Sequence, residues 1–176
     1  MLYLHTNDNR IIDMNQIMFH TQEDRGNVLT KPIMCRRKNA WLGSAFYFWA
    51  EEEDAIRWGY DSKNGRFQVY SARIVSERVL DTVFKKEHYD FFRNALERLA
   101  SKIVKKTGKK LSLNLLCQYL NERAEWKKEI DVLIINDNPQ GEREIFPIPI
   151  RKRIQAAVYN EGCIREFKLI NCYAGS

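Results

Sequence analysis

Hydrophobic and polar positions along the chain follow two different periods, and each change of period marks a new element. A short apolar patch at 17–19 runs into a polar stretch, 21–40, that is expected to be mostly loop. Residues 45–49, AFYFW, form an apolar and aromatic run typical of a buried strand. Residues 66–75 alternate between apolar and polar positions, which predicts another strand. Three further strands are expected at 130–135, 154–159 and 164–169.

The period changes to that of a helix between residues 84 and 106. One apolar face there is spaced by four, three and four residues: Phe92, Leu96, Leu99 and Ile103. A second helix is expected after Ser112, with Leu113, Leu116 and Leu120 on its buried side. A short helix is expected from residue 51, where four acidic residues favour the positive end of a helix dipole. Strands therefore flank a central helical insertion at about 84–128, which predicts an α+β fold.

Length and composition limit the class of protein. A chain of 176 residues, 44% hydrophobic and 30% charged, predicts a single packed domain over 1–176. No stretch approaches the roughly 18 consecutive apolar residues of a membrane span. The first residues lack a basic run followed by an apolar stretch, so a cytoplasmic location is expected. The net charge of +6 is compatible with a nucleic-acid partner and equally with an ordinary basic protein.

Cysteines and histidines give no sign of a metal site. The four cysteines form no C-x-x-C pair, so buried, reduced thiols are expected. The chain has three histidines, too few to favour a His-rich metal centre, and no metal is expected.

One group of segments does suggest chemistry. The segment WLGSAFYFW at 41–49 is followed by Ala55, and Phe19-His20-Thr21 precedes it with 27 positions between His20 and Tyr47. A final apolar strand begins beside Gln155. This constellation resembles the diphtheria-toxin-like and PARP-like ADP-ribosyltransferases, whose motif residues are His, Tyr and Glu or Gln. The resemblance implies a split β-sandwich of the ADP-ribosyltransferase type with helices, and NAD as substrate.

The resemblance also implies roles for individual residues. Tyr47 would stack on the nicotinamide ring, His20 would bond the adenosine ribose, and Gln155 would hold the nicotinamide-side ribose. The catalytic set implied is therefore His20, Tyr47 and Gln155. The implied NAD-binding set is His20, Thr21, Gly43, Ser44, Tyr47 and Ala55. Arg36, Arg37 and Lys38, just before the motif strand, are expected to contact the acceptor, because family members contact acceptors there.

The sequence departs from the family pattern at three positions. Thr21 and Ala45 stand where glycines are usual, and Gln155 stands where a carboxylate is usual. Gln155 carries no charge and is no general base, so the chemistry would rely on the acceptor's own nucleophile or on another acid, with Glu144 and Glu161 the nearest along the sequence. His5 is an alternative to His20 as the motif histidine.

Three functions remain open at this point. The resemblance implies a mono-ADP-ribosyltransferase acting on RNA, DNA or protein, and by analogy a bacterial toxin or phage-defence effector with an antitoxin protein as partner. The departures favour instead an inactive nucleic-acid-binding module with the same fold. An NAD-using RNA 2′-phosphotransferase is the third possibility.

Overall fold

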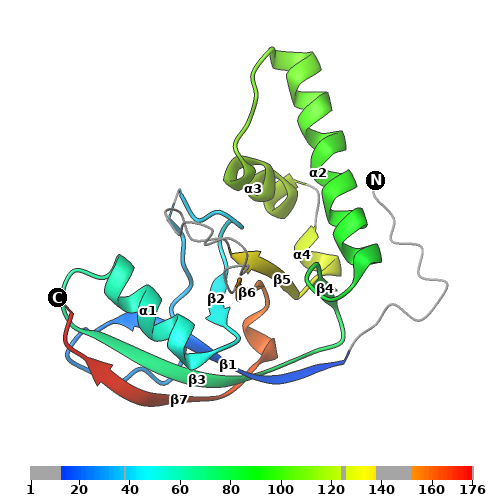
Figure 1. Cartoon of the computed structure of the whole chain (residues 1–176). Coiled ribbons are helices and arrows are strands. Elements are labelled where there is room, and N and C mark those ends of the chain that lie inside the picture. The colour runs from blue at the N-terminus through cyan, green and yellow to red at the C-terminus, as the bar shows by residue number, and fades with distance from the viewer. Residues whose placement is uncertain (1–12, 38, 124–125, 138–151, 176) are drawn as a thin grey trace, which may run out of the picture.

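The computed structural model describes residues 13–37, 39–123, 126–137 and 152–175. Seven strands form one mixed sheet in the order β4-β5-β6-β2-β1-β3-β7 (Figure 1). Among these pairs β4 and β5 run parallel, and the others are antiparallel. The α+β prediction is confirmed at this level. The strands are β1 Met14–Glu23, β2 Phe46–Trp49, β3 Phe67–Ser76, β4 Val79–Asp81, β5 Val132–Asp137, β6 Arg153–Val158 and β7 Ile164–Tyr173.

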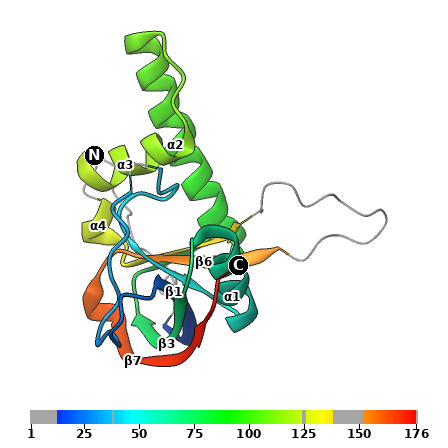
Figure 2. The same cartoon turned by 90° about the vertical axis from the view of Figure 1, so that its left-hand side faces the viewer.

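The sheet consists of two halves joined at one point. Strands β1 and β2 are neighbours through a single residue pair, Phe19 with Trp49. Figures 1 and 2 show β1, β3 and β7 at the bottom of the molecule, with β2, β6 and β5 above them. A core cluster is shared by both halves, because Met18 and Ile74 from one half pack with Phe48 and Val158 from the other.

Within the described residues four α-helices accompany the sheet: α1 Glu52–Ser62, α2 Lys86–Thr107, α3 Leu113–Arg123 and α4 Trp126–Glu129. Helix α1 lies close against β3 because Gly59 has no side chain. A Cβ atom there would lie 2.2 Å from the Phe67 ring. Helix α2 projects beyond the rest of the molecule, with α3 beside it (Figure 1).

Both helical groups cover the same face of the sheet. Phe92 and Leu99 of α2 pack with Leu116 of α3 against Leu133 and Ala157 of the sheet. On the other half, Ala55 of α1 packs with Trp49, Phe67 and Val69. Strand register shows that Leu133, Ala157, Trp49 and Val69 all point to this face.

Most predicted elements lie within two residues of the observed ones. Helix α2 ends at Gly108, whose φ of 70° is the left-handed conformation that glycine adopts readily. Strand β1 is longer than the 17–19 patch, because it forms a continuous ladder with β3 from Met14 to Glu23. Strand β5 continues to Asp137, two residues beyond its predicted end at 135, because pairing with β6 persists. Leu113 is exposed, contrary to its predicted burial.

The cysteines differ in environment. Cys117 and Cys163 are buried, as expected, while Cys35 is half-buried and Cys172 is exposed. All four are free thiols. Burial raises the pKa of Cys117 to about 12, which makes this thiol unreactive at neutral pH.

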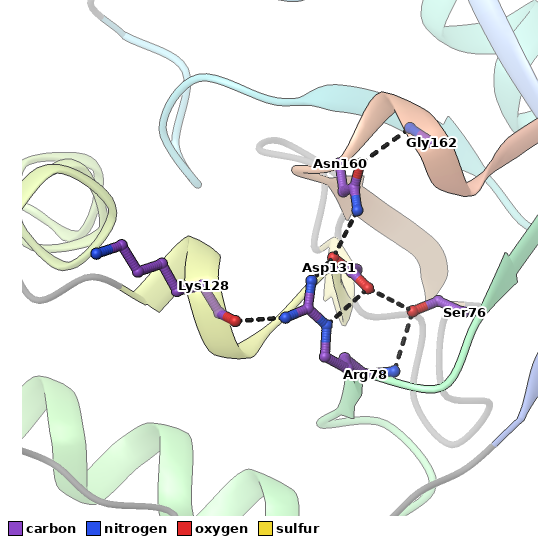
Figure 3. Close-up of polar contacts among 6 residues, drawn as sticks. All are labelled: Ser76, Arg78, Lys128, Asp131, Asn160 and Gly162. Atoms are coloured by element: carbon purple, nitrogen blue, oxygen red, sulfur yellow. Dashed lines mark hydrogen bonds and ion pairs between the residues drawn. The ribbon is translucent and has the colours of Figure 1, made fainter.

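A polar cluster at the start of β5 ties the end of β3 to the β6–β7 connection (Figure 3). Asp131 accepts hydrogen bonds from Ser76 Oγ at 3.1 Å, Arg78 Nε at 3.0 Å and Asn160 Nδ2 at 3.0 Å. Arg78 also donates to the Lys128 carbonyl. Burial alone would raise the pKa of Asp131, but these donors outweigh it and the pKa lies below its ordinary value.

Asp131→Asn is expected to lower the free energy of unfolding by about 1–2 kcal/mol at pH 7, since Arg78 and Asn160 lose a charged acceptor. The folded-state pKa of Asp131 is lowered, so the ionised side chain stabilises the folded state in full above the unfolded-state pKa of about 3.9. This stabilisation is lost as the pH falls through the folded-state pKa of Asp131. Urea unfolding at pH 7, 5 and 3 measures this, and the difference from the parent should shrink at pH 3. Asp90→Asn on the exposed face of α2 is the control, and it should change the free energy of unfolding little. An equal loss of stability in that variant would contradict the stabilising role of the Asp131 hydrogen bonds.

Candidate functional site

A cavity of about 500 Å³ opens beside the end of β1. Strands β1, β2, β5 and β6 line it, together with α1 and the segment 25–41 that connects β1 to β2. Its size lies within the roughly 300–1,000 Å³ of small-molecule sites. The residues predicted from the sequence that line it are His20, Thr21, Arg36, Arg37, Tyr47 and Gln155.

The cavity lies where the two halves of the sheet separate. Beyond the Phe19–Trp49 pair, the described residues give β1 no strand neighbour on its β2 side. All four remaining residues of β1, from His20 to Glu23, line the cavity. A strand edge of this kind presents main-chain N–H and C=O groups to a ligand.

His20 is a buried, neutral imidazole on the cavity wall. Its Nδ1 lies 2.8 Å from the Tyr47 carbonyl oxygen, which can only accept, so Nδ1 carries the proton. Burial lowers the pKa of His20, and the Tyr47 hydrogen bond and the neighbouring Gln22 side chain oppose this shift without overcoming it. By hydrogen-bond geometry, Nε2 is buried with no partner in the described part of the chain. In this tautomer Nε2 is an unpaired acceptor.

Tyr47 is held by its hydroxyl group. The O–H donates to the Gly43 carbonyl at 2.7 Å and accepts from the Leu42 N–H at 3.2 Å. Burial raises the pKa of Tyr47 above its ordinary value, so the phenol stays protonated at neutral pH. The half-buried ring lines the cavity and offers an aromatic face, not a base.

Gln155 is fixed by a tryptophan from the connecting segment. Trp41 Nε1–H donates to Gln155 Oε1 at 2.9 Å. An indole can only donate, so this contact determines which end of the amide faces Trp41. Gln155 is buried between its strand partners Trp49 and Ile135, and it lines the cavity. The amide oxygen therefore already has one donor before any ligand binds.

Most of the other predicted NAD-binding residues lie away from the cavity wall. Thr21 lines it, but the Thr21 hydroxyl donates to the Ala55 carbonyl and so joins β1 to α1. Gly43, Ser44 and Ala55 do not line the cavity. Gly43 instead supplies a φ of 80° and the acceptor for Tyr47, and Ala55 is fully buried on the side of α1 that packs against the sheet.

Cations outnumber carboxylates along the cavity wall. Arg25, Arg36, Arg37 and Lys63 line it, against Glu23 and Asp137 among the described residues. Arg36 and Arg37 are exposed, and Lys38 lies outside the described residues. Burial and the Arg37 guanidinium lower the pKa of Lys63, with Glu23 opposing them. This part of the cavity suits an anion.

The sequence did not identify Asp137, Lys63 or the role of Trp41. Asp137 lies beyond the predicted end of its strand at 135, and it shares a face of β5 with Ile135 because it follows by two residues. His5 and Glu144 lie outside the described residues, and Glu161 does not line the cavity. Across the described part of the chain, no cluster of His, Cys, Asp and Glu could hold a metal ion, and no helix is long and apolar enough to cross a membrane.

Comparison with known proteins gives one distant similarity. No protein-family model matches the chain. An alignment 127 residues long, which covers 65% of this chain, is 27% identical to an uncharacterized protein of Methanocaldococcus jannaschii. The chain spans about 55% of that protein's length.

Proposed function

We propose that the chain is an NAD-dependent mono-ADP-ribosyltransferase that transfers ADP-ribose from NAD to a macromolecule. The observation that carries the proposal is that His20, Tyr47 and Gln155 line one cavity of about 500 Å³ although 27 and 108 positions separate them in sequence. These are the residues that the resemblance implies, in the same order. Strand register puts Tyr47 and Gln155 on one face of the sheet, and His20 reaches the cavity from the other face, beside Phe48.

The contacts of each residue suit the part of NAD that it would bind. The unpaired Nε2 of His20 would accept a hydrogen bond from a ribose hydroxyl once the ring moves from its packing against Phe48 and Phe167. The Tyr47 ring would stack on nicotinamide, a flat aromatic group. The open edge of β1 would bond the carboxamide, whose N–H₂ and C=O match main-chain partners.

The fold supports the same proposal. The two halves of the sheet meet at one residue pair and share a core cluster, which is the arrangement expected of a split sandwich with a ligand between its halves. The helical insertion follows β4 and covers the half that carries Gln155.

Nucleic acid is the acceptor we propose, because exposed Arg36 and Arg37 border the cavity.

Replacing both Arg36 and Arg37 with Ala should weaken binding of a single-stranded RNA or DNA. It should also flatten the plot of log affinity against log salt by about 0.7–0.9 for each phosphate that the protein no longer neutralises.

The matched control is Lys105→Ala with Lys106→Ala, which removes the same charge from the exposed end of α2. Binding titrations from about 50 to 200 mM salt measure both slopes. An unchanged slope in the arginine variant, or an equal change in the lysine control, would leave a protein acceptor as the better assignment.

The experiment that tests the function is incubation with NAD labelled in its adenine part, together with RNA, DNA or a protein extract. Transfer is expected to leave label on one macromolecule class and to release unlabelled nicotinamide. Binding of nucleic acid with no consumption of NAD would favour the inactive module, for which the neutral, Trp41-bonded Gln155 is the supporting observation. A toxin or phage-defence role remains part of the proposal and would appear as growth arrest on expression.

A further inference from the structure

Asp137 places a carboxylate beside Gln155 in the cavity. Asp137 pairs with Arg153 and Ile135 pairs with Gln155, so Asp137 and Gln155 point to the same face of neighbouring strands as diagonal neighbours. Diagonal neighbours of this kind have Cα atoms about 7–8 Å apart. Both residues line the cavity, and the Asp137 side chain is 20% exposed.

Arg153 fixes the position of this carboxylate. Its Nη2 lies 2.8 Å from Asp137 Oδ2, and its guanidinium lies 5.0 Å from the centre of the Trp49 ring. The Arg153 side chain is 5% exposed, and Nε and Nη1 have no hydrogen-bond partner within the described residues. The buried guanidinium therefore holds the Asp137 side chain in place beside the cavity.

A second carboxylate lies beside the ion pair of Asp137 and Arg153. Asp61 Oδ2 lies 3.8 Å from Arg153 Nη1, so one guanidinium is shared by two carboxylates and the group carries one net negative charge. Asp61 belongs to α1 and does not line the cavity, whereas Asp137 does. Among the described residues, Arg153 is the hydrogen-bond donor to Asp137, which leaves Oδ1 for a ligand.

We propose that Asp137 supplies the negative charge that Gln155 lacks in NAD cleavage, an inference that rests on the proposed function. As the ribose C1′–nitrogen bond breaks, its electron pair leaves with nicotinamide and positive charge develops on C1′ and the ring oxygen. The Asp137 carboxylate stabilises that charge, while Gln155 orients the ribose. A lone pair of the acceptor then forms the new bond to C1′, and the acceptor's proton passes to solvent.

Asp137→Asn tests this role because it keeps the shape of the side chain and removes its charge. Nicotinamide release should fall about 10- to 100-fold, whereas NAD affinity should change less than about threefold, because the charge acts mainly in the transition state. Asp61→Asn is the matched comparison: it removes the other carboxylate beside Arg153 and so the net charge of the group, and it should lower the rate less than Asp137→Asn does, because Asp61 does not line the cavity.

Two further variants separate chemistry from folding. Asp137→Asn combined with Arg153→Gln removes both charges of the buried pair and should show the same loss, with a normal unfolding transition. Asp137→Asn combined with Gln155→Glu returns a carboxylate to the neighbouring strand and should raise nicotinamide release at least tenfold above that of Asp137→Asn.

An Asp137→Asn protein that releases nicotinamide at the parental rate would overturn the role of Asp137 alone. A parent protein that neither binds nor cleaves NAD would overturn the proposed function and this inference with it.

Discussion

Gln155→Ala is expected to reduce ADP-ribose transfer by about 10²-fold or more, the size of effect seen when one positioned hydrogen-bonding group is removed from an active site. The loss should be larger in transfer rate than in NAD affinity, because the amide orients the ribose at which charge develops. The fold should survive, since Gln155 is one polar group beside a cavity and its strand neighbours Trp49 and Ile135 are unchanged.

Trp41→Phe is the control for this variant. It removes the indole N–H that bonds Gln155 Oε1 and keeps an aromatic ring in the connecting segment. Transfer should fall less than tenfold, because the amide remains in the cavity. Initial rates with and without acceptor measure both variants. Parental rates for Gln155→Ala would show that Gln155 has no catalytic role.

Tyr47→Ala is expected to weaken NAD binding by about 1–3 kcal/mol, or roughly 5- to 150-fold, through the loss of an aromatic stack and its buried area. This variant also removes the hydroxyl that joins the Leu42 N–H to the Gly43 carbonyl. Its thermal unfolding should therefore be measured beside its affinity for NAD.

Tyr47→Phe separates the two contributions. It keeps the ring and removes only the hydroxyl, so NAD affinity should stay within a few-fold of the parent if stacking dominates. Titration calorimetry gives the three dissociation constants. If Phe and Ala weaken binding equally, the loop anchor explains the effect and the stacking role is wrong.

The elements with strong local periodicity were predictable from the sequence. The aromatic run 45–49 forms β2, and the face of Phe92 and Leu99 forms the buried side of α2. Strands β1 and β7 are both longer than predicted, and the cause is the same. Each extends beyond its apolar residues because ladder pairing with β3 continues through polar positions. Pairing with a distant strand leaves no signal in the local pattern.

The candidate site was predictable only in part, for the same reason. His20, Tyr47 and Gln155 follow from a motif, and the structure brings them to one cavity. Asp137 and Lys63 follow from no motif, because their positions depend on the β5–β6 register and on where α1 ends. The Trp41–Gln155 contact joins residues 114 positions apart, so it was visible only in the fold.

Nicotinamide release from NAD is the measurement that tests the proposed function most directly. The purified full chain, incubated with NAD and single-stranded RNA or DNA, should release one nicotinamide for each ADP-ribose attached, and Gln155→Ala should abolish most of this release. An absence of nicotinamide release with RNA, DNA and protein acceptors alike would contradict the transferase assignment, even if NAD occupies the cavity.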